Sequence, residues 1–257
     1  MSAISGISST SPYLYGYIAS GKRLMSAADG AAELAVTEKE HAQITGINTG
    51  TKNLGDGISL LKTSDSALGS ITNSLQRMRE LALQASGTLL NYSNRASIQQ
   101  EIEQLKQEIN HVATRTNFND LSLLNGSQSS GIELVGDADG NSFNVNHSIN
   151  STIDALGLAD FDVTKDFDLQ AIDRALEMVT GDRSTLGAQH NALEYAIDYN
   201  GYASENLTAS MSRMGDTDVA KTLMELKYQQ TIRSVSMMLQ KKNMSQNRQQ
   251  TLGLLQM

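Results

Sequence analysis

The 257-residue sequence contains no cysteine, no tryptophan and a single proline, Pro12. The absence of cysteine excludes disulfides, thiolate metal sites and cysteine nucleophiles. Because proline interrupts helices, a chain nearly free of it can form long ones. Aromatic residues make up only 5% of the chain, and a core must therefore be built mainly from Leu, Ile, Val, Ala and Met.

Long hydrophobic runs are also missing. No segment approaches the roughly 18–20 continuous apolar residues of a membrane span, so we expect no membrane insertion. Residues 1–23 lack both the basic start and the apolar run of a cleavable signal peptide. These rules predict either a cytoplasmic protein or one that is exported without such a signal.

Charge is distributed unevenly along the chain, whose net charge is −8. Residues 126–168 carry eight acidic side chains against one lysine, a net charge of −7, whereas residues 219–257 carry six basic side chains against one glutamate, a net charge of +5. An acidic protein lacks the broad basic face that duplex nucleic acid requires. We therefore expect no nucleic-acid partner, and we interpret the basic C-terminal region as a solvated helix face.

The spacing of apolar residues predicts four helices. Within residues 56–86 and 94–114, apolar residues recur at alternating steps of three and four, which places an apolar seam along one side of each helix. The polar segment 87–95 is interpreted as a turn, so these two helices are expected to be antiparallel. A third helix is expected over residues 168–213 and a fourth over residues 218–243. The seam residues of the first two helices are Leu61, Leu68, Ile71, Leu75, Met78, Ala82 and Ala85, then Ile98, Ile102, Leu105, Ile109 and Val112.

The third helix differs from the first two because four of its seam positions are polar: Arg183, His190, Asn200 and Ser204. Polar seam residues cost stability but can fix the register of packed helices. The remaining seam positions of this helix are apolar, so it is still expected to pack lengthwise against its neighbours.

One β element is expected, in the middle of the chain. Alternating side chains at residues 132–135 and 143–145 flank a turn that contains Asp139-Gly140, a combination typical of a β-hairpin. The predicted fold is mainly α: a long antiparallel helical rod, built as a three-helix coiled-coil-like bundle, with a small β-hairpin and a terminal helical segment. The predicted domains are a terminal domain of residues 1–20 and 216–257, a rod of residues 21–125 and 168–215, and an acidic insertion of residues 126–167.

No catalytic, cofactor-binding or metal-binding constellation is found. The segment from Gly16 to Arg23 nearly spells a phosphate-binding P-loop, but Arg23 replaces the hydroxyl residue that would hold Mg²⁺, and a basic turn is the better interpretation. Asp137 and Asp139 begin like a calcium loop, but the glutamate required at its twelfth position is Ser148. The four histidines are widely separated. The chain is therefore not expected to be an enzyme.

Several strings at both ends of the chain resemble one family, the bacterial flagellins. The resemblance covers residues 18–125 and 170–257, at motif positions that agree in order. The matching strings are Ser20-Gly21-Lys22-Arg23, Asn53-x-x-Asp56-Gly57-Ile58-Ser59, Leu75-Gln76-Arg77-Met78-Arg79-Glu80-Leu81-Ala82, Asn117-Phe118-Asn119, Glu205-Asn206-Leu207-Thr208-Ala209 and Asp216-x-Asp218-x-Ala220-Lys221.

The resemblance implies a structural subunit of the bacterial flagellar filament, which self-assembles into a helical polymer for motility and needs no cofactor. It also implies export through the flagellar secretion channel without a cleavable signal, with the help of a flagellin chaperone. Two alternatives remain open: a non-polymerising flagellin-like paralogue or hook–filament junction protein, and a receptor- or chaperone-binding helical module.

The resemblance also implies two sets of contact residues. Arg77, Leu81 and Glu101 match positions where the family is contacted by the flagellin-sensing Toll-like receptor of vertebrates. Only 19 residues precede Ser20, fewer than in the family, so the C-terminal helix is expected to lack a full-length partner within the chain. Its apolar side chains are then expected to pack against other subunits or an export chaperone; they are Leu223, Met224, Leu226, Tyr228, Val235 and Met238.

Overall fold

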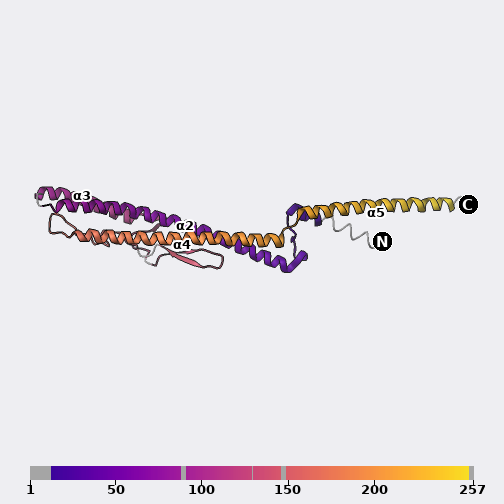
Figure 1. The fold of residues 1–257 in the computed structure, drawn as a ribbon, viewed down its shortest axis with the longest axis horizontal. Coiled ribbons are helices and arrows are strands. Elements are labelled where there is room, and N and C mark those ends of the chain that lie inside the picture. Colours follow the sequence, from indigo (N-terminus) through magenta and orange to yellow (C-terminus); the bar gives the residue numbers. More distant parts are fainter. Residues whose placement is uncertain (1–12, 88–90, 129, 146–148, 255–257) are drawn as a thin grey trace. The chain divides into compact units, whose positions relative to one another are not determined.

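A computed structural model describes residues 13–87, 91–128, 130–145 and 149–254. Most of them belong to long helices (Figure 1). The helices are α2 (Ala27–Ala85), α3 (Tyr92–Arg115), α4 (Leu169–Gly215) and α5 (Val219–Leu254), and residues 13–20 are also helical. Two antiparallel hairpins pair β1 (Asn117–Phe118) with β2 (Leu121–Ser122), and β3 (Ile132–Val135) with β4 (Ser142–Val145). The predicted mainly α fold, a helical rod with a small β-hairpin, is confirmed.

The chain divides into two compact units. Residues 43–205 form one, called here the central unit, and residues 1–42 with 206–257 form the other, called the terminal unit. Both α2 and α4 contribute residues to each unit. Within the part of the chain that the structure describes, none of the helices is long and apolar enough to cross a membrane.

The core of the central unit lies along the seams of α2, α3 and α4. All seven predicted seam residues of α2 are at most 1% exposed. Ile102 and Ile109 of α3 are fully buried opposite them, and Ile172 and Val179 bring α4 into the same core. Burying one such side chain is worth about 1.5–3 kcal/mol, so the seams account for the lengthwise packing of the three helices. In Figure 1, α3 runs alongside α2.

The first helix begins much earlier than predicted: α2 starts at Ala27, with a kink at Gly30 where the backbone is not helical, instead of at residue 56. Gly46, Gly50 and Gly55 weaken the helical pattern before residue 56, because glycine is a poor helix former. The seam nevertheless continues through this segment, where Ile47 and Leu54 are buried. The prediction was wrong because two of these glycines serve close packing within the helix and do not end it.

The β3–β4 hairpin lies against those glycines of α2. A Cβ atom added at Gly50 would overlap the carbonyl group of Gly136, and one added at Gly46 would lie 2.6 Å from the Cβ of Ala138. Asn53 donates a hydrogen bond from Nδ2 to the carbonyl oxygen of Val135, at 3.1 Å. Glycine therefore lets the hairpin turn approach the helix backbone more closely than any other residue would allow.

The polar seam positions of α4 all have partners in the central unit. Asn200 is only 4% exposed and donates from Nδ2 to the carbonyl oxygen of Gly136 at 2.7 Å. Arg183 pairs with Asp65, with 2.8 Å between Nε and Oδ1. Nδ1 of His190 lies 3.7 Å from Oε2 of Glu194. The hydroxyl of Ser204 donates to Oδ1 of Asn48 at 3.3 Å.

The expectation of a single β element was wrong, because residues 117–122 form a second hairpin. Its two turn residues, Asn119 and Asp120, both have positive φ values, 47° and 64°. Asn and Asp tolerate this conformation better than other non-glycine residues, and such a two-residue loop suits a tight hairpin. The strands are only two residues long, too short for an alternation to be recognised in the sequence.

In the terminal unit, the segment that resembles a P-loop is helical up to Ser20 and forms the predicted turn only at Gly21 to Arg23. The amide of Arg23 donates to the carbonyl oxygen of Gly215 at 2.7 Å, and the amide of Thr217 donates to that of Gly21 at 2.9 Å. The guanidinium group of Arg23 also donates to the carbonyl oxygen of Met214 and pairs with Glu33, each at 2.6 Å. This arginine is therefore occupied in holding the turn together.

The last helix, α5, extends eleven residues beyond its predicted end at residue 243, to Leu254. The glutamine- and asparagine-rich stretch from 243 to 250 has no apolar period, so the sequence pattern gave no reason to extend the helix. This stretch has neither proline nor glycine, and nothing in it interrupts a helix.

Candidate functional site

The predicted receptor-contact residues lie on neighbouring helices of the central unit. Arg77 of α2 donates from Nη2 and Nε to Oε1 of Glu101 on α3, at 2.7 and 2.9 Å. It also donates to Glu80 at 3.2 Å. The side chains of Arg77 and Glu101 are 51% and 44% exposed. Hydrogen bonds to Glu101 and Glu80 raise the pKa of Arg77, so this group is always charged.

Leu81 is placed differently from these two charged residues. It is only 3% exposed and belongs to the buried core. The structure therefore brings Arg77 and Glu101 together at the surface, while Leu81 lies in the buried core. An ion pair of similar exposure lies close by in sequence, where Arg79 donates from Nε to Asp173 at 2.6 Å. It offers a matched control for any test of Arg77.

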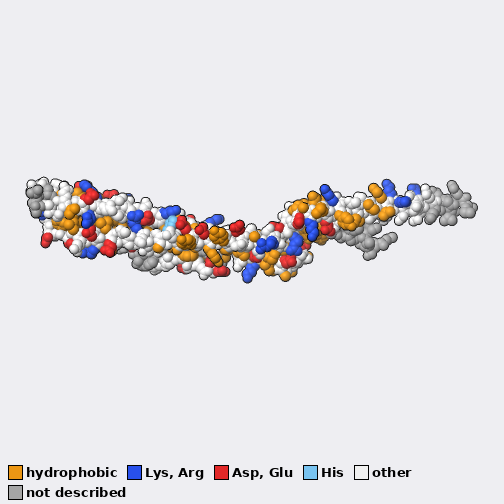
Figure 2. Space-filling model, viewed as in Figure 1, with side chains coloured by type: hydrophobic (Ala, Val, Ile, Leu, Met, Phe, Trp, Pro, Cys, Tyr) orange, Lys and Arg blue, Asp and Glu red, His pale blue; other side chains and the backbone are white. Residues whose placement is uncertain are grey.

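Most of the predicted packing residues of α5 are exposed. Met224, Tyr228 and Met238 are 65–71% exposed, Val235 is 50% exposed and Leu223 is 41% exposed. Figure 2 shows hydrophobic and basic side chains along this helix. We call these five residues the α5 face. Leu226 differs from them, because it is 4% exposed and packs inside the terminal unit.

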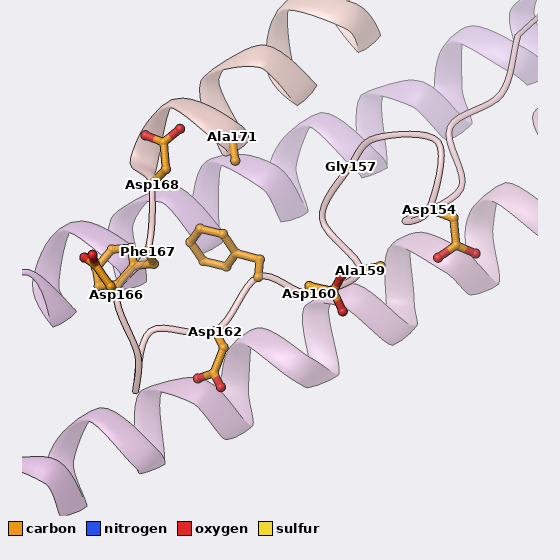
Figure 3. Close-up of a pocket in the computed structure, with 10 residues that line it drawn as sticks. Asp154, Gly157, Ala159, Asp160, Asp162, Asp166, Phe167, Asp168 and Ala171 are labelled. Carbon is orange, nitrogen blue, oxygen red and sulfur yellow. The ribbon is translucent and has the colours of Figure 1, made fainter.

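A pocket of about 390 Å³ lies in the acidic segment of the central unit (Figure 3). Five aspartates line it, but their carboxylates point in different directions. Asp162 accepts hydrogen bonds from the side chain and amide of Thr164, which lower the pKa of Asp162. Asp168 accepts a hydrogen bond from the amide of Gln170 at the start of α4 and pairs with Arg174.

These aspartates do not form a metal site. Across the described residues, no group of three or more His, Cys, Asp or Glu side chains is arranged to hold a metal ion. The rings of Phe161 and Phe167, whose centroids are 5.8 Å apart in an edge-to-face arrangement, line the same pocket. The segment therefore joins apolar residues such as Leu158 and Val163, which are buried in the core of the central unit, with acidic side chains that line the pocket.

Sequence analysis did not single out one feature of α4. Tyr195, Tyr199 and Tyr202 are 75%, 72% and 69% exposed. Their spacing of four and three residues places them on one side of the helix, away from the buried Leu193 and Asn200. The spacing of the three tyrosines is visible in the sequence, but the apolar seam on the other side of the same helix is the stronger pattern.

Comparison with known proteins agrees with this architecture. Residues 14–129 match the bacterial flagellin N-terminal helical region, and residues 169–255 match the bacterial flagellin C-terminal helical region. The chain is 38% identical over 213 residues to a flagellin of Halalkalibacterium halodurans, covering 81% of this chain and 78% of that one. It is 35% identical over 247 residues to a flagellin of Bacillus subtilis, covering 81% of each.

Solved structures give the same result. A crystal structure of Bacillus cereus flagellin superposes with a TM-score of 0.51 at 34% identity, covering 58% of this chain and 88% of that one. A putative flagellar hook-associated protein from Vibrio parahaemolyticus has a TM-score of 0.60 at 18% identity, covering 73% and 100% of the two chains, and shares the fold. The chain therefore belongs to the bacterial flagellins, structural proteins that polymerise into the flagellar filament and are not enzymes.

Proposed function

We propose that the α5 face carries this flagellin into its filament by packing against other subunits. In this proposal residues 1–20 and 216–257 form the terminal domain that lines the filament core. Residues 21–125 and 168–215 form the rod, and the acidic residues 126–167 lie on the outer surface. The supporting observation is the exposure of five large apolar side chains on one helix, because exposed apolar patches of this kind mark interaction surfaces.

Elongation of filament seeds by purified protein tests this proposal. Val235→Asp places a charge in the α5 face, whereas Ser236→Asp places the same charge one residue further on, at a half-buried polar position on another side of the helix. We expect Val235→Asp to abolish elongation and leave helical content and melting nearly unchanged, and Ser236→Asp to elongate seeds. Elongation is measured by sedimentation and electron microscopy. Equal elongation by the two variants would contradict the proposal.

Leu226→Asp separates folding from assembly. Because Leu226 is buried within the terminal unit, a charge there is expected to lower the melting temperature of the monomer, unlike Val235→Asp. A monomer that melts normally with aspartate at position 226 would show that this side chain has no packing role within its own chain.

Before assembly, the exposed apolar side chains of the α5 face favour non-specific association unless a partner binds them. We infer that a flagellar export chaperone binds the α5 face and that the chain leaves the cell through the flagellar export channel with its N-terminus intact. Intact mass of the secreted protein tests the export route, since cleavage by a signal peptidase would remove N-terminal residues. Titration calorimetry with the flagellin chaperone of the same bacterium tests the binding: Val235→Asp is expected to weaken it and Ser236→Asp to leave it unchanged.

A second proposed interaction involves the vertebrate flagellin-sensing Toll-like receptor. The supporting observation is the half-exposed pair of Arg77 and Glu101, since arginine is common among the residues that dominate interfaces. Leu81 would act from the core, by holding α2 in place beneath the pair.

Binding of the full chain to the receptor ectodomain tests this contact. We expect Arg77→Ala and Glu101→Ala each to weaken binding, whereas Arg79→Ala breaks a comparable ion pair and should not. Each single substitution also breaks the Arg77–Glu101 pair, so the double exchange of Arg77→Glu with Glu101→Arg completes the test. The double exchange can restore an ion pair while reversing the charge at both positions. The doubly exchanged variant should still fail to bind the receptor ectodomain. Wild-type affinity of both alanine variants would overturn the assignment.

A further inference from the structure

Methionine supplies all the sulfur of this chain, which has 11 methionines and no cysteine. Oxidants that reach the protein therefore meet thioethers without competition from a thiol. The methionines differ widely in exposure, because Met78 of α2 is fully buried whereas six others in the described part of the chain are 48–71% exposed. The rate at which each methionine is oxidised should follow its exposure.

The exposed methionines are concentrated on α5. Four of the six belong to this helix, and Met25 and Met178 are the other two. Met224 and Met238 are 66% and 71% exposed and belong to the α5 face. They are separated by about four helical turns, so their side chains lie on the same side of α5, together with that of Val235.

The remaining two methionines of α5 lie on a different side of the helix. Met237 is next to Met238 in sequence and is therefore turned about 100° away from it around the helix axis. Met244 follows Met237 by about two turns and shares its side. These two residues are 55% and 70% exposed. They provide a matched control pair within the same helix.

We propose that Met224 and Met238 form a reversible oxidation site, at which hydrogen peroxide or another hydroperoxide prevents assembly of the free subunit. A lone pair of the thioether sulfur attacks the outer oxygen of the peroxide, so that a sulfur–oxygen bond forms and the oxygen–oxygen bond breaks. With hydrogen peroxide, the departing hydroxide takes the proton from the transferred oxygen and leaves as water. The sulfur loses two electrons and becomes a sulfoxide, and the peroxide is reduced.

Oxidation makes the α5 face polar without adding a net charge. A sulfoxide oxygen is a hydrogen-bond acceptor on a side chain that was apolar, and burying it without a donor is unfavourable. Leu226, the buried residue that packs α5 inside the terminal unit, has no sulfur and is not modified. The oxidised subunit should therefore stay folded and lose only its ability to assemble.

Access to the two sulfurs should change on assembly. Both side chains are exposed in the single chain, and packing of the α5 face against other subunits would cover them. The inference rests on this proposed role of the α5 face and adds a modification that controls it. Reversal needs methionine sulfoxide reductases, one for each sulfoxide epimer. Their thiol reductant supplies two electrons, and the oxygen leaves as water.

Seed elongation by peroxide-treated chain tests the inference. Monomer is treated with hydrogen peroxide, the peroxide is removed with catalase, and peptide mass spectrometry measures the sulfoxide at each methionine. We expect Met224 and Met238 to be oxidised about tenfold faster than Met78, or more. The oxidised monomer should melt normally but require a critical concentration for elongation that is higher by about tenfold or more. Treatment with both reductases and dithiothreitol should restore elongation.

Leucine variants assign the effect to particular sulfurs. Leucine is close to methionine in volume but cannot be oxidised. Met224→Leu with Met238→Leu should therefore elongate seeds equally well before and after peroxide treatment. Met237→Leu with Met244→Leu removes the same number of sulfurs from the other side of α5, and it should still lose elongation on oxidation.

Three results would overturn the inference: normal elongation by chain that is fully oxidised at Met224 and Met238, equal losses in the two leucine variants, or unfolding of the oxidised monomer. None of them affects the proposed packing of the α5 face, which Val235→Asp tests without an oxidant. Filaments treated with peroxide test both proposals together. If Met224 and Met238 are oxidised as fast in filaments as in monomer, assembly does not cover the α5 face, and the proposed function fails with the inference.

Discussion

Replacing Asn200 tests whether a buried polar side chain of α4 holds the β3–β4 hairpin. Its Nδ2 group donates to the carbonyl oxygen of Gly136 at 2.7 Å and to Oγ1 of Thr51 at 3.3 Å. Asn200→Ala removes both bonds and leaves the buried carbonyl group of Gly136 without this donor. An unsatisfied buried group costs about 1–3 kcal/mol, and the small cavity adds to that, so we expect a loss of about 2–3 kcal/mol.

The neighbouring asparagine supplies the control. Asn53 donates to the carbonyl oxygen of Val135, next to Gly136 in the hairpin, but from a more exposed position. Water can replace this bond, so Asn53→Ala should cost about 0.5–1 kcal/mol. The free energy of unfolding is measured by urea denaturation, and hydrogen exchange of the β3–β4 amides shows whether the hairpin opens first.

A substitution of nearly identical shape isolates the donated hydrogen bond. Asn200→Asp replaces the donor by a carboxylate oxygen that faces the Gly136 carbonyl oxygen, so at pH 7 it should cost more than Asn200→Ala, about 3 kcal/mol or more. Burial raises the pKa of such a carboxyl group, and its protonated form can donate. The penalty should therefore shrink as the pH falls through that raised pKa. Equal losses for the Asn200 and Asn53 variants would refute the reasoning.

Three further predictions concern the helices. Gly50→Ala should destabilise the central unit and speed exchange in the hairpin, whereas Gly55→Ala, where an added Cβ meets no atom within 4 Å, should stabilise it by about 0.5–1 kcal/mol. Burial raises the pKa of Asp182 above 3.8, so its charged form is unfavourable in the fold. Asp182→Asn should therefore raise the melting temperature at pH 7, and this advantage should shrink as the pH falls through the raised pKa of Asp182 and be gone at pH 3.8. Hydrogen bonds from the hydroxyl of Tyr17 and from Ser26 lower the pKa of Asp29. The stabilisation from Asp29 should be present above pH 3.8 and disappear as the pH falls through its lowered pKa, and chemical-shift titration of Asp29→Asn against the native chain checks this.

The helices were predictable wherever apolar period and burial coincide. Residues 94–114 predicted α3 to within two residues at its start and one at its end, because Ile102 and Ile109 fall on one face and that face is buried. The same rule failed for the first half of α2. There the helix packs through glycines against a hairpin, and a small side chain in close contact leaves no hydrophobic signal.

The candidate site was less predictable, because it depends on which helices meet. Arg77 and Glu101 are 24 residues apart and pair only because α3 returns alongside α2. Leu81 lies one turn from Arg77, and a sequence pattern alone gives no reason to place one at the surface and the other in the core. Packing against the rest of the bundle makes that distinction.

Apolar side chains of the central unit and of α5 differ in their burial. In the central unit the α2 seam is buried within the subunit, and the partly buried Ile98 and Leu105 of α3 pack against the same core. Along α5 the reverse holds: Leu226 is buried, while the α5 face stays open to contact. Substitutions in the seam should therefore act on monomer stability first, and on assembly only through it. Substitutions in the α5 face should stop growth of the filament in a subunit that still folds, so monomer melting and seed elongation together distinguish the two classes of substitution.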